Sequence, residues 1–302
     1  MADPAAAADH DTGSRPWLAF AACAAIWGTT FLAISIGNDA LAPVWASAVR
    51  LVLASALLFL WCLIRRIPLP RGEALKASLW FGALNFGLNM PLLYWGEARA
   101  PSGLSAVMFS TVPLTTSLLA RAFGMEELQP RRVLGAVIAL GGVALLFSGS
   151  LTGKLSFPGL AAVFASAPTA HATAFAAIAL WRGPRLYIVE PTAAIVADAV
   201  ACAVGAAFAL TGSLLLHESH ALPPTAAAWF PLIYLTLAGS LGAFVIYTWL
   251  VNHWPLSRAS YLGVVVPLIA MFAGTLVRHE PVTASILGGS ALVLAGLVTG
   301  MR

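Results

Sequence analysis

Two stretches decide the fold of this chain: WGEARAPSGLSAVMFSTVPL at residues 95–114 and WLVNHWPLSRASYLGVVVPL at residues 249–268. Shifting the chain by 154 residues aligns them without a gap, so that Trp95 meets Trp249 and Pro101 meets Pro255. The same shift pairs further identical residues downstream: Pro113 with Pro267, Leu114 with Leu268, Glu126 with Glu280, Gly135 with Gly289 and Gly142 with Gly296. Paired prolines and glycines in one register indicate an internal repeat.

The composition is that of an integral membrane protein. Of the 302 residues, 60% are hydrophobic and 9% are charged, and the mean hydropathy is +0.88. A soluble domain carries about 25% charged residues, so this chain cannot cover a water-facing surface of ordinary size. This excludes soluble globular, disordered, coiled-coil and nucleic-acid-binding proteins. Despite the pI of 9.3, the basic residues are scattered through short loops and do not form a patch.

No sequence motif indicates a cofactor or a metal. The three cysteines lie far apart inside apolar stretches, which predicts small buried side chains and neither a disulfide framework nor a metal site; they are Cys23, Cys62 and Cys202. A P-loop and a GxGxxG motif are both absent from the sequence, so we expect no ATP-driven reaction. The expected partners are a small-molecule substrate and the lipid bilayer, with a monomer as the oligomeric state.

Ten transmembrane helices are predicted, because a helix needs about 20 apolar residues to cross a hydrocarbon core about 30 Å thick. The spans are 17–37, 43–64, 76–96, 101–121, 131–149, 156–181, 188–214, 229–252, 257–277 and 283–300. Residues 1–16 are polar, and we expect a disordered cytoplasmic terminus there. The first apolar stretch is longer than the core of a signal peptide, which predicts a retained helix.

The basic residues predict the orientation of these helices. With the N-terminus inside, twelve of the sixteen Lys and Arg residues fall on the cytoplasmic side, and Arg99, Lys154 and Arg278 fall outside. Arg50 is the one that lies within a span. Both termini are therefore expected in the cytoplasm. Nine of the ten tryptophans lie near a predicted helix end or in a loop, as expected at a membrane interface.

The repeat predicts two halves of opposite orientation, because each half holds an odd number of helices. The fold class is thus an all-α membrane protein, with five-helix repeats at residues 17–149 and 156–300 around a central cavity. Inverted repeats of this kind are typical of secondary transporters, whose substrate site lies near the midplane. Duplicated membrane domains also form channels and scaffolds.

Several segments resemble a known family. The first helix carries AAIWGTTFLAISIG, the second opens with APVWASAVRLVLASALL, and residues 94–149 run from YWGEARAPSG to the glycine-rich GAVIALGGVALLFSG. This is similar to the EamA branch of the drug/metabolite transporter superfamily. Within it, the chain most resembles the YddG-type exporters of aromatic and other amino acids. The resemblance implies ten helices in two inverted halves, and a cavity lined by helices one, three, four, six, eight and nine.

The first and third helices supply four candidate cavity residues. Trp27 and Thr30 could offer an aromatic wall and a hydroxyl, or could pack and bond within their own helix. Asn85 and Asn89 lie four residues apart, hence on one helix face, which should point inward because a carboxamide facing lipid lacks partners. They could bind a substrate's ammonium or carboxylate, or tie helices together.

The remaining candidates lie in the later helices. Those proposed for the cavity are Met108, Phe109, His171, Phe175, Tyr247 and Tyr261. His171 follows Pro168 in mid-span, where a proline frees a backbone carbonyl, and it could bind a carboxylate, carry a proton or form one bond between helices. Pro113, Pro168 and Pro267 are hinge candidates, with static kinks as the alternative.

Two charges, Arg50 and Asp198, lie within spans, where a charge is costly and usually faces a cavity or a partner. Arg50 could attract a carboxylate, snorkel outward or have a structural role, which is our leading interpretation. Asp198 could carry a proton or pair with helix hydroxyls. Direct pairing of the two is possible but not favoured by their depths.

Together these features predict a protein that is no enzyme: a secondary transporter exporting small metabolites, most simply amino acids of broad range, by alternating access. Its expected location is the inner (cytoplasmic) membrane of a bacterium. The alternatives are a passive channel or facilitator, and a carrier for a nucleotide sugar or sugar phosphate. A phosphate substrate would need several basic residues in the cavity, whereas only Arg50 lies within a span.

Overall fold

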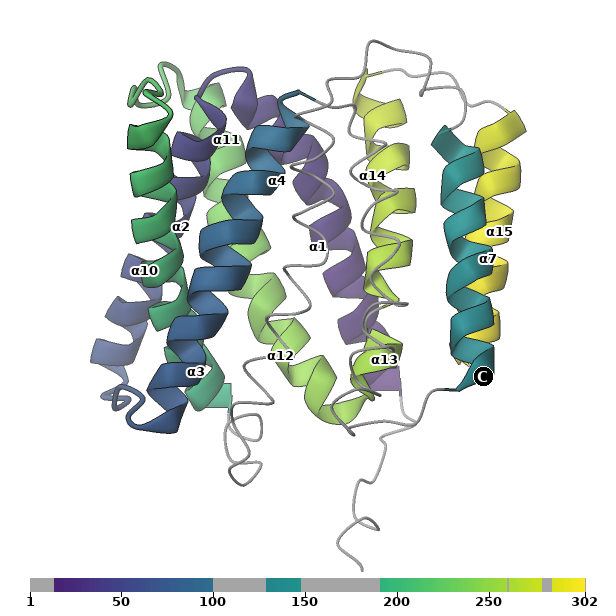
Figure 1. Cartoon of the computed structure of the whole chain (residues 1–302), viewed down its shortest axis with the longest axis horizontal. Coiled ribbons are helices and arrows are strands. Elements are labelled where there is room, and N and C mark those ends of the chain that lie inside the picture. The colour runs from purple at the N-terminus through teal and green to yellow at the C-terminus, as the bar shows by residue number, and fades with distance from the viewer. Residues whose placement is uncertain (1–13, 100–128, 148–190, 260, 279–283, 302) are drawn as a thin grey trace, which may run out of the picture.

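The chain folds into apolar helices that stand side by side (Figure 1). The computed structural model describes residues 14–99, 129–147, 191–259, 261–278 and 284–301, and every regular element in these ranges is helical. Four of the described helical segments are long and apolar enough to cross a membrane: Ser14–Asn38, Pro43–Ile64, Ile195–Leu215 and Ala226–Val251. The protein is therefore a multi-pass membrane protein.

The helix bounds follow the predicted spans closely. Among the straight helices, these bounds are α1 Ser14–Asn38, α2 Pro43–Ile64, α7 Pro130–Phe147, α10 Pro191–Leu215 and α15 Ala284–Met301. The α2 bounds agree with the prediction because Pro43 fits the first turn of a helix, where its missing N–H has no partner to lose. The predicted helices 101–121 and 156–181 lie outside the described residues.

Two helix bounds differ from the predicted spans. α1 begins at Ser14, one turn before the apolar run that defined the span, whereas residues 1–13 of the expected disordered terminus lie outside the described residues. The predicted single helix 257–277 is divided into α13, Leu256–Ala259, and α14, Leu262–Arg278. The chain turns at Tyr261, whose buried side chain packs inside the molecule, and an apolar run does not reveal such a turn.

The third and eighth predicted spans each contain a π-helical segment. The third runs without a break through α3 (Glu73–Phe81), η1 (Gly82–Asn89) and α4 (Met90–Glu97). The eighth runs through α11 (Ala226–Tyr234), η2 (Leu235–Gly242) and α12 (Ala243–His253). π-Helical segments are rare and are frequently found at functional sites. Here they occupy nearly the same place in the two halves of the sequence repeat.

Helices α7 and α15 pack through glycines and run antiparallel (Figure 1). A Cβ atom on Gly135 would lie 2.6 Å from the carbonyl oxygen of Gly296, and one on Gly142 would lie 2.8 Å from that of Gly289. Only glycine permits such an approach. The sequence repeat pairs Gly135 with Gly289 and Gly142 with Gly296. The Gly135–Gly296 contact therefore corresponds to the Gly289–Gly142 contact when the two halves are exchanged.

Two further close approaches hold the rest of the bundle. A Cβ atom on Gly28 of α1 would lie 2.4 Å from a side-chain carbon of Ile269 in α14. One on Gly205 of α10 would lie 2.3 Å from the Cβ of Phe86 in η1. The π-helical elements pack against neighbouring helices as well: η1 packs on α10, and η2 packs on α2 and α1. The three cysteines are free and buried.

Both described ends of the chain lie on one face of the bundle. Helices α1, α3, α7, α10 and α14 begin at the lower face in Figure 1, whereas α2, α12 and α15 end there. Basic residues gather at the helix ends of that face: Arg15, Arg65, Arg66, Arg71, Lys76, Arg131, Arg132 and Arg258. At the opposite face, the described helix ends carry Arg99 and Arg278.

Candidate functional site

The deepest charge in the described part of the chain is the Arg50 guanidinium. Arg50 is only 1% exposed, and its Nε donates to Ser240 Oγ at 2.8 Å. Its Nη1 donates to the Tyr94 hydroxyl at 3.1 Å. On η2, a Cβ atom at Gly239 would lie 3.1 Å from Nη2, so the absence of a side chain there makes room for the guanidinium. Arg50 therefore joins α2, α4 and η2, and it does not snorkel outward.

No carboxylate neutralises this charge among the described residues, where the ion pair found is the exposed Lys76–Glu73. Asp198 on α10 is also buried, but it forms no ion pair with Arg50. This agrees with the sequence-based expectation that the two charges lie at different depths and do not pair directly. A guanidinium carries five N–H donors, and the two bonds above go to neutral hydroxyls. A buried cation with neutral partners and spare donors is suited to an anionic group.

Thr30 lies beside this group on α1. Its Oγ1 donates to the Ile26 carbonyl at 2.9 Å, the back-bonding that we considered as an alternative to a cavity role. The same oxygen would lie 3.5 Å from a Cβ atom on Gly239, so Thr30 and Arg50 approach the same point of η2. As an acceptor, the Thr30 hydroxyl remains available to a ligand.

Aromatic rings continue the site by one helical turn. The Trp27 ring centroid lies 5.2 Å from that of Tyr247 and 5.8 Å from that of Phe244. Phe244 in turn lies 5.0 Å from Phe86 of η1. Trp27 and Tyr247 were both predicted from the sequence, and the structure brings them together. The rings lie on the same segments as two neighbours of Arg50: Trp27 precedes Thr30 in α1, and Phe244 of α12 follows Ser240 of η2.

The two asparagines of η1 are buried, as expected of amides that avoid lipid. Asn85 is 8% exposed and Asn89 is 4% exposed. The Asn89 Nδ2 donates to Asn85 Oδ1 at 3.5 Å, and Asn89 Oδ1 has no hydrogen-bond partner among the residues that the structure describes. One amide oxygen is thus left for another donor. Contact of these asparagines with a substrate stays a prediction.

Tyr261 has a structural contact. Its ring is 1% exposed, and its hydroxyl donates to the Arg132 carbonyl at 3.0 Å, which ties the turn before α14 to the start of α7. Pro267 lies inside α14, where Val266 and Ile269 contact the Gly28 position of α1. The other predicted residues lie outside the described residues: Met108, Phe109, Pro113, Pro168, His171 and Phe175.

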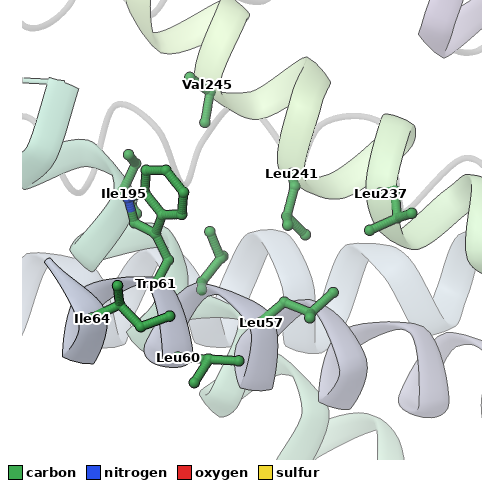
Figure 2. A pocket seen from close by; sticks show the side chains of 9 residues that line it. Leu57, Leu60, Trp61, Ile64, Ile195, Leu237, Leu241 and Val245 are labelled. Carbon is green, nitrogen blue, oxygen red and sulfur yellow. The ribbon is translucent and has the colours of Figure 1, made fainter.

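A separate groove of about 450 Å³ runs between α2, α10 and the η2–α12 segment (Figure 2). Nine apolar side chains line it, among them Leu57, Trp61, Leu237 and Leu241. Trp61 and Leu237 are each 50% exposed. Apart from the indole N–H of Trp61, the lining side chains are hydrocarbon and offer nothing to orient a polar substrate, so we assign this groove to lipid contact.

Sequence reasoning missed several members of the site: Tyr94, Gly239, Ser240 and Phe244. Arg50 was a signal, since a buried guanidinium needs partners, but its partners are 44 and 190 residues away along the chain. Neither a hydroxyl nor a glycine in an apolar helix is distinctive by itself. The contacts depend on the packing of η2 against α2.

The comparison with protein families now decides the identity of this helical membrane protein. The EamA-like transporter family matches residues 15–148 and again residues 188–300. The chain belongs to the EamA-like transporter family. Its members are transporters rather than enzymes, and the two matches together cover most of the chain.

Individual relatives agree with this family. An inner membrane transporter YedA of Escherichia coli K12 is 26% identical over 83% of this chain and 78% of its own. The transporter YoaV of Bacillus subtilis is 25% identical over 90% of this chain and 91% of its own. A probable terminal-alkyne amino-acid exporter of Streptantibioticus cattleyicolor is 28% identical over 40% of each chain. A solved crystal structure shares the fold, with a TM-score of 0.74 at 19% identity over 95% of this chain and 96% of that one.

Proposed function

We propose that this EamA-family transporter exports amino acids, aromatic ones among them, across the inner membrane of a bacterium by alternating access. The observation that carries the proposal is the buried Arg50 guanidinium with neutral partners, one turn from an aromatic cluster. An α-carboxylate beside a bulky side chain has the complementary chemistry. Opposite charges in a dry site form the shorter, stronger class of hydrogen bond.

The site divides into two parts that match the two parts of such a substrate. The carboxylate binds the spare donors of Arg50, with Thr30 beside it on α1. The side chain lies against Trp27, Tyr247 and Phe244, whose broad apolar faces accept different side chains without specific hydrogen bonds. This arrangement supports a YddG-type range of amino acids. A partial relative named for amino-acid export agrees with it.

Alternating access follows from two five-helix repeats of opposite orientation, at residues 17–149 and 156–300, around a central cavity. Three observations support these repeats: the family matches the chain twice, the π-helical segments occupy corresponding places, and the α7–α15 contacts exchange with each other. Helix ends rich in arginine mark the cytoplasmic face, which then holds both termini. Pro267 lies inside α14, between the Val266 and Ile269 residues that contact Gly28, and is a candidate hinge between the halves.

Counterflow in proteoliposomes tests this function. Vesicles are loaded with unlabelled phenylalanine, threonine or lysine, and labelled amino acid is followed from outside, with empty vesicles and a UDP-sugar as controls. We expect transient accumulation in the vesicles loaded with amino acid. Uptake that never overshoots or saturates would indicate a channel instead, and flux with the UDP-sugar alone would replace the substrate.

A further inference from the structure

A buried carboxylate lies at the end of α4 that faces away from the basic face. Glu97 is the last residue of α4, and both of its carboxylate oxygens are buried without a hydrogen-bond partner among the described residues. An isolated ionised carboxylate is costly to bury, and native structures normally provide it with donors. The described part of the chain gives Glu97 none, although the helix end is ordered by backbone bonds.

The groups around Glu97 add more acceptors rather than donors. Asn38, at the end of α1, donates its Nδ2 to the Tyr94 carbonyl at 3.4 Å, and its buried Oδ1 likewise has no partner in the described ranges. Glu97 is also the last residue of α4, and a helix C-terminus carries partial negative charge. A carboxylate, an amide oxygen and a helix C-terminus together favour a cation.

The nearby cations of the described chain are engaged elsewhere. Arg99 donates to the Trp95 carbonyl at 3.0 Å, and its guanidinium lies 4.0 Å over the Trp95 ring. Arg50 is held by Ser240 and Tyr94. Within the described ranges no Lys or Arg side chain pairs with Glu97, so its carboxylate is open to a bound cation.

We propose that Glu97 and Asn38 bind the ammonium group of the transported amino acid. This inference rests on the proposed function and extends it. Tyr94 connects the two charged sites, since its hydroxyl accepts from Arg50 and it lies one turn before Glu97, within electrostatic reach of both charges. An ammonium group has three donors and no acceptor, which suits a set of oxygens without donors. The substrate class is then the free zwitterion: a compound whose amine is acylated cannot use Glu97.

Glu97→Gln is the decisive variant, with the exposed Glu73→Gln as its matched control. For wild type, we expect phenylalanine to compete in counterflow far better than N-acetylphenylalanine. In Glu97→Gln this preference should shrink by about tenfold to 100-fold, the effect of losing one charge-assisted hydrogen bond. Glu97→Asp, which keeps the charge, should retain part of the preference, and Glu73→Gln should retain all of it.

Thermal unfolding in detergent without substrate separates a binding role from a structural one. Because Glu97 is buried without partners, Glu97→Gln should melt at the same temperature as wild type or higher. A lower melting temperature together with an unchanged preference for phenylalanine would overturn the proposal, since Glu97 would then stabilise the fold. Wild-type transport that needs Na⁺, and loses this need in Glu97→Gln, would assign the site to a metal ion. If wild type carries N-acetylphenylalanine and phenylalanine equally, the ammonium site fails while amino-acid transport stands; if it carries neither, both proposals fail.

Discussion

Replacing Gly142 by alanine should weaken the contact between α7 and α15. The new Cβ atom would lie 2.7 Å from the Val293 nitrogen and 2.8 Å from both the Gly289 carbonyl oxygen and the Leu292 Cβ. Two of these atoms belong to the backbone and cannot rotate away. The neighbouring Gly141 provides a matched control, because a Cβ atom there would meet no atom within 4 Å.

The size of the effect follows from these distances. An ordinary contact to such atoms begins near 3.4 Å, so the helices must separate by roughly 0.6 to 0.7 Å. A gap of about 0.5 to 1 Å already forfeits a quarter to a half of the dispersion energy between facing atoms. Overpacking of this kind costs about 1 to 3 kcal/mol. Gly141→Ala should instead be neutral or gain up to about 1 kcal/mol in helix propensity.

Thermal unfolding of both variants in the same detergent measures this difference. We expect Gly142→Ala to melt several degrees below Gly141→Ala, at roughly 2 to 4 °C per kcal/mol for a large domain. Both variants change glycine to alanine in the same helix, so the gain in helix propensity is the same in both. The difference between their melting temperatures therefore reports the contact with α15. Equal melting temperatures would refute the close packing of α7 on α15.

Two further predictions concern contacts at the helix ends. Glu218→Ala should lower the free energy of unfolding by about 1 to 2 kcal/mol in a denaturant titration. The Glu218 carboxylate accepts hydrogen bonds from the Val44 and Trp45 N–H groups at the start of α2, at 3.2 and 2.8 Å. An unchanged free energy of unfolding would mean that water replaces this cap. Tyr261→Phe should cost about 1 kcal/mol through the lost bond to the Arg132 carbonyl and leave amino-acid counterflow unchanged, whereas altered substrate preference would return Tyr261 to the cavity.

The membrane spans could be predicted from the sequence because their signals are local. Runs of apolar residues, a proline at the first turn of α2 and an arginine pair after its last turn define that helix. The burial of Asn85 and Asn89 was also predictable, since an amide in a span avoids lipid. In these cases the difference between lipid and water determines where a helix runs and which side chains are buried. The identity of the neighbouring helix does not matter.

The arrangement of the site could not be predicted in the same way. The bond between Arg50 and Ser240 depends on how η2 is wound, and nothing in its LTLAGSLG sequence distinguishes a π-helix from an α-helix. The turn at Tyr261 and the unpartnered oxygens of Glu97 depend on what distant helices place nearby. Such features require the tertiary contacts, although a glutamate at a helix end inside a membrane protein was a signal that the sequence contained.

The central claim is that Arg50 binds the carboxylate of a transported amino acid, and one measurement tests it directly. Counterflow of labelled phenylalanine is compared in wild type, Arg50→Met and the exposed-site control Arg65→Met, with phenylalanine and phenethylamine as competitors. We expect Arg50→Met to raise the half-saturation concentration for phenylalanine by about 30- to 150-fold, the equivalent of about 2 to 3 kcal/mol. Competition by phenethylamine, which has no carboxylate, should change little, and Arg65→Met should behave as wild type. Folded Arg50→Met protein that carries phenylalanine with the wild-type half-saturation concentration would contradict the account.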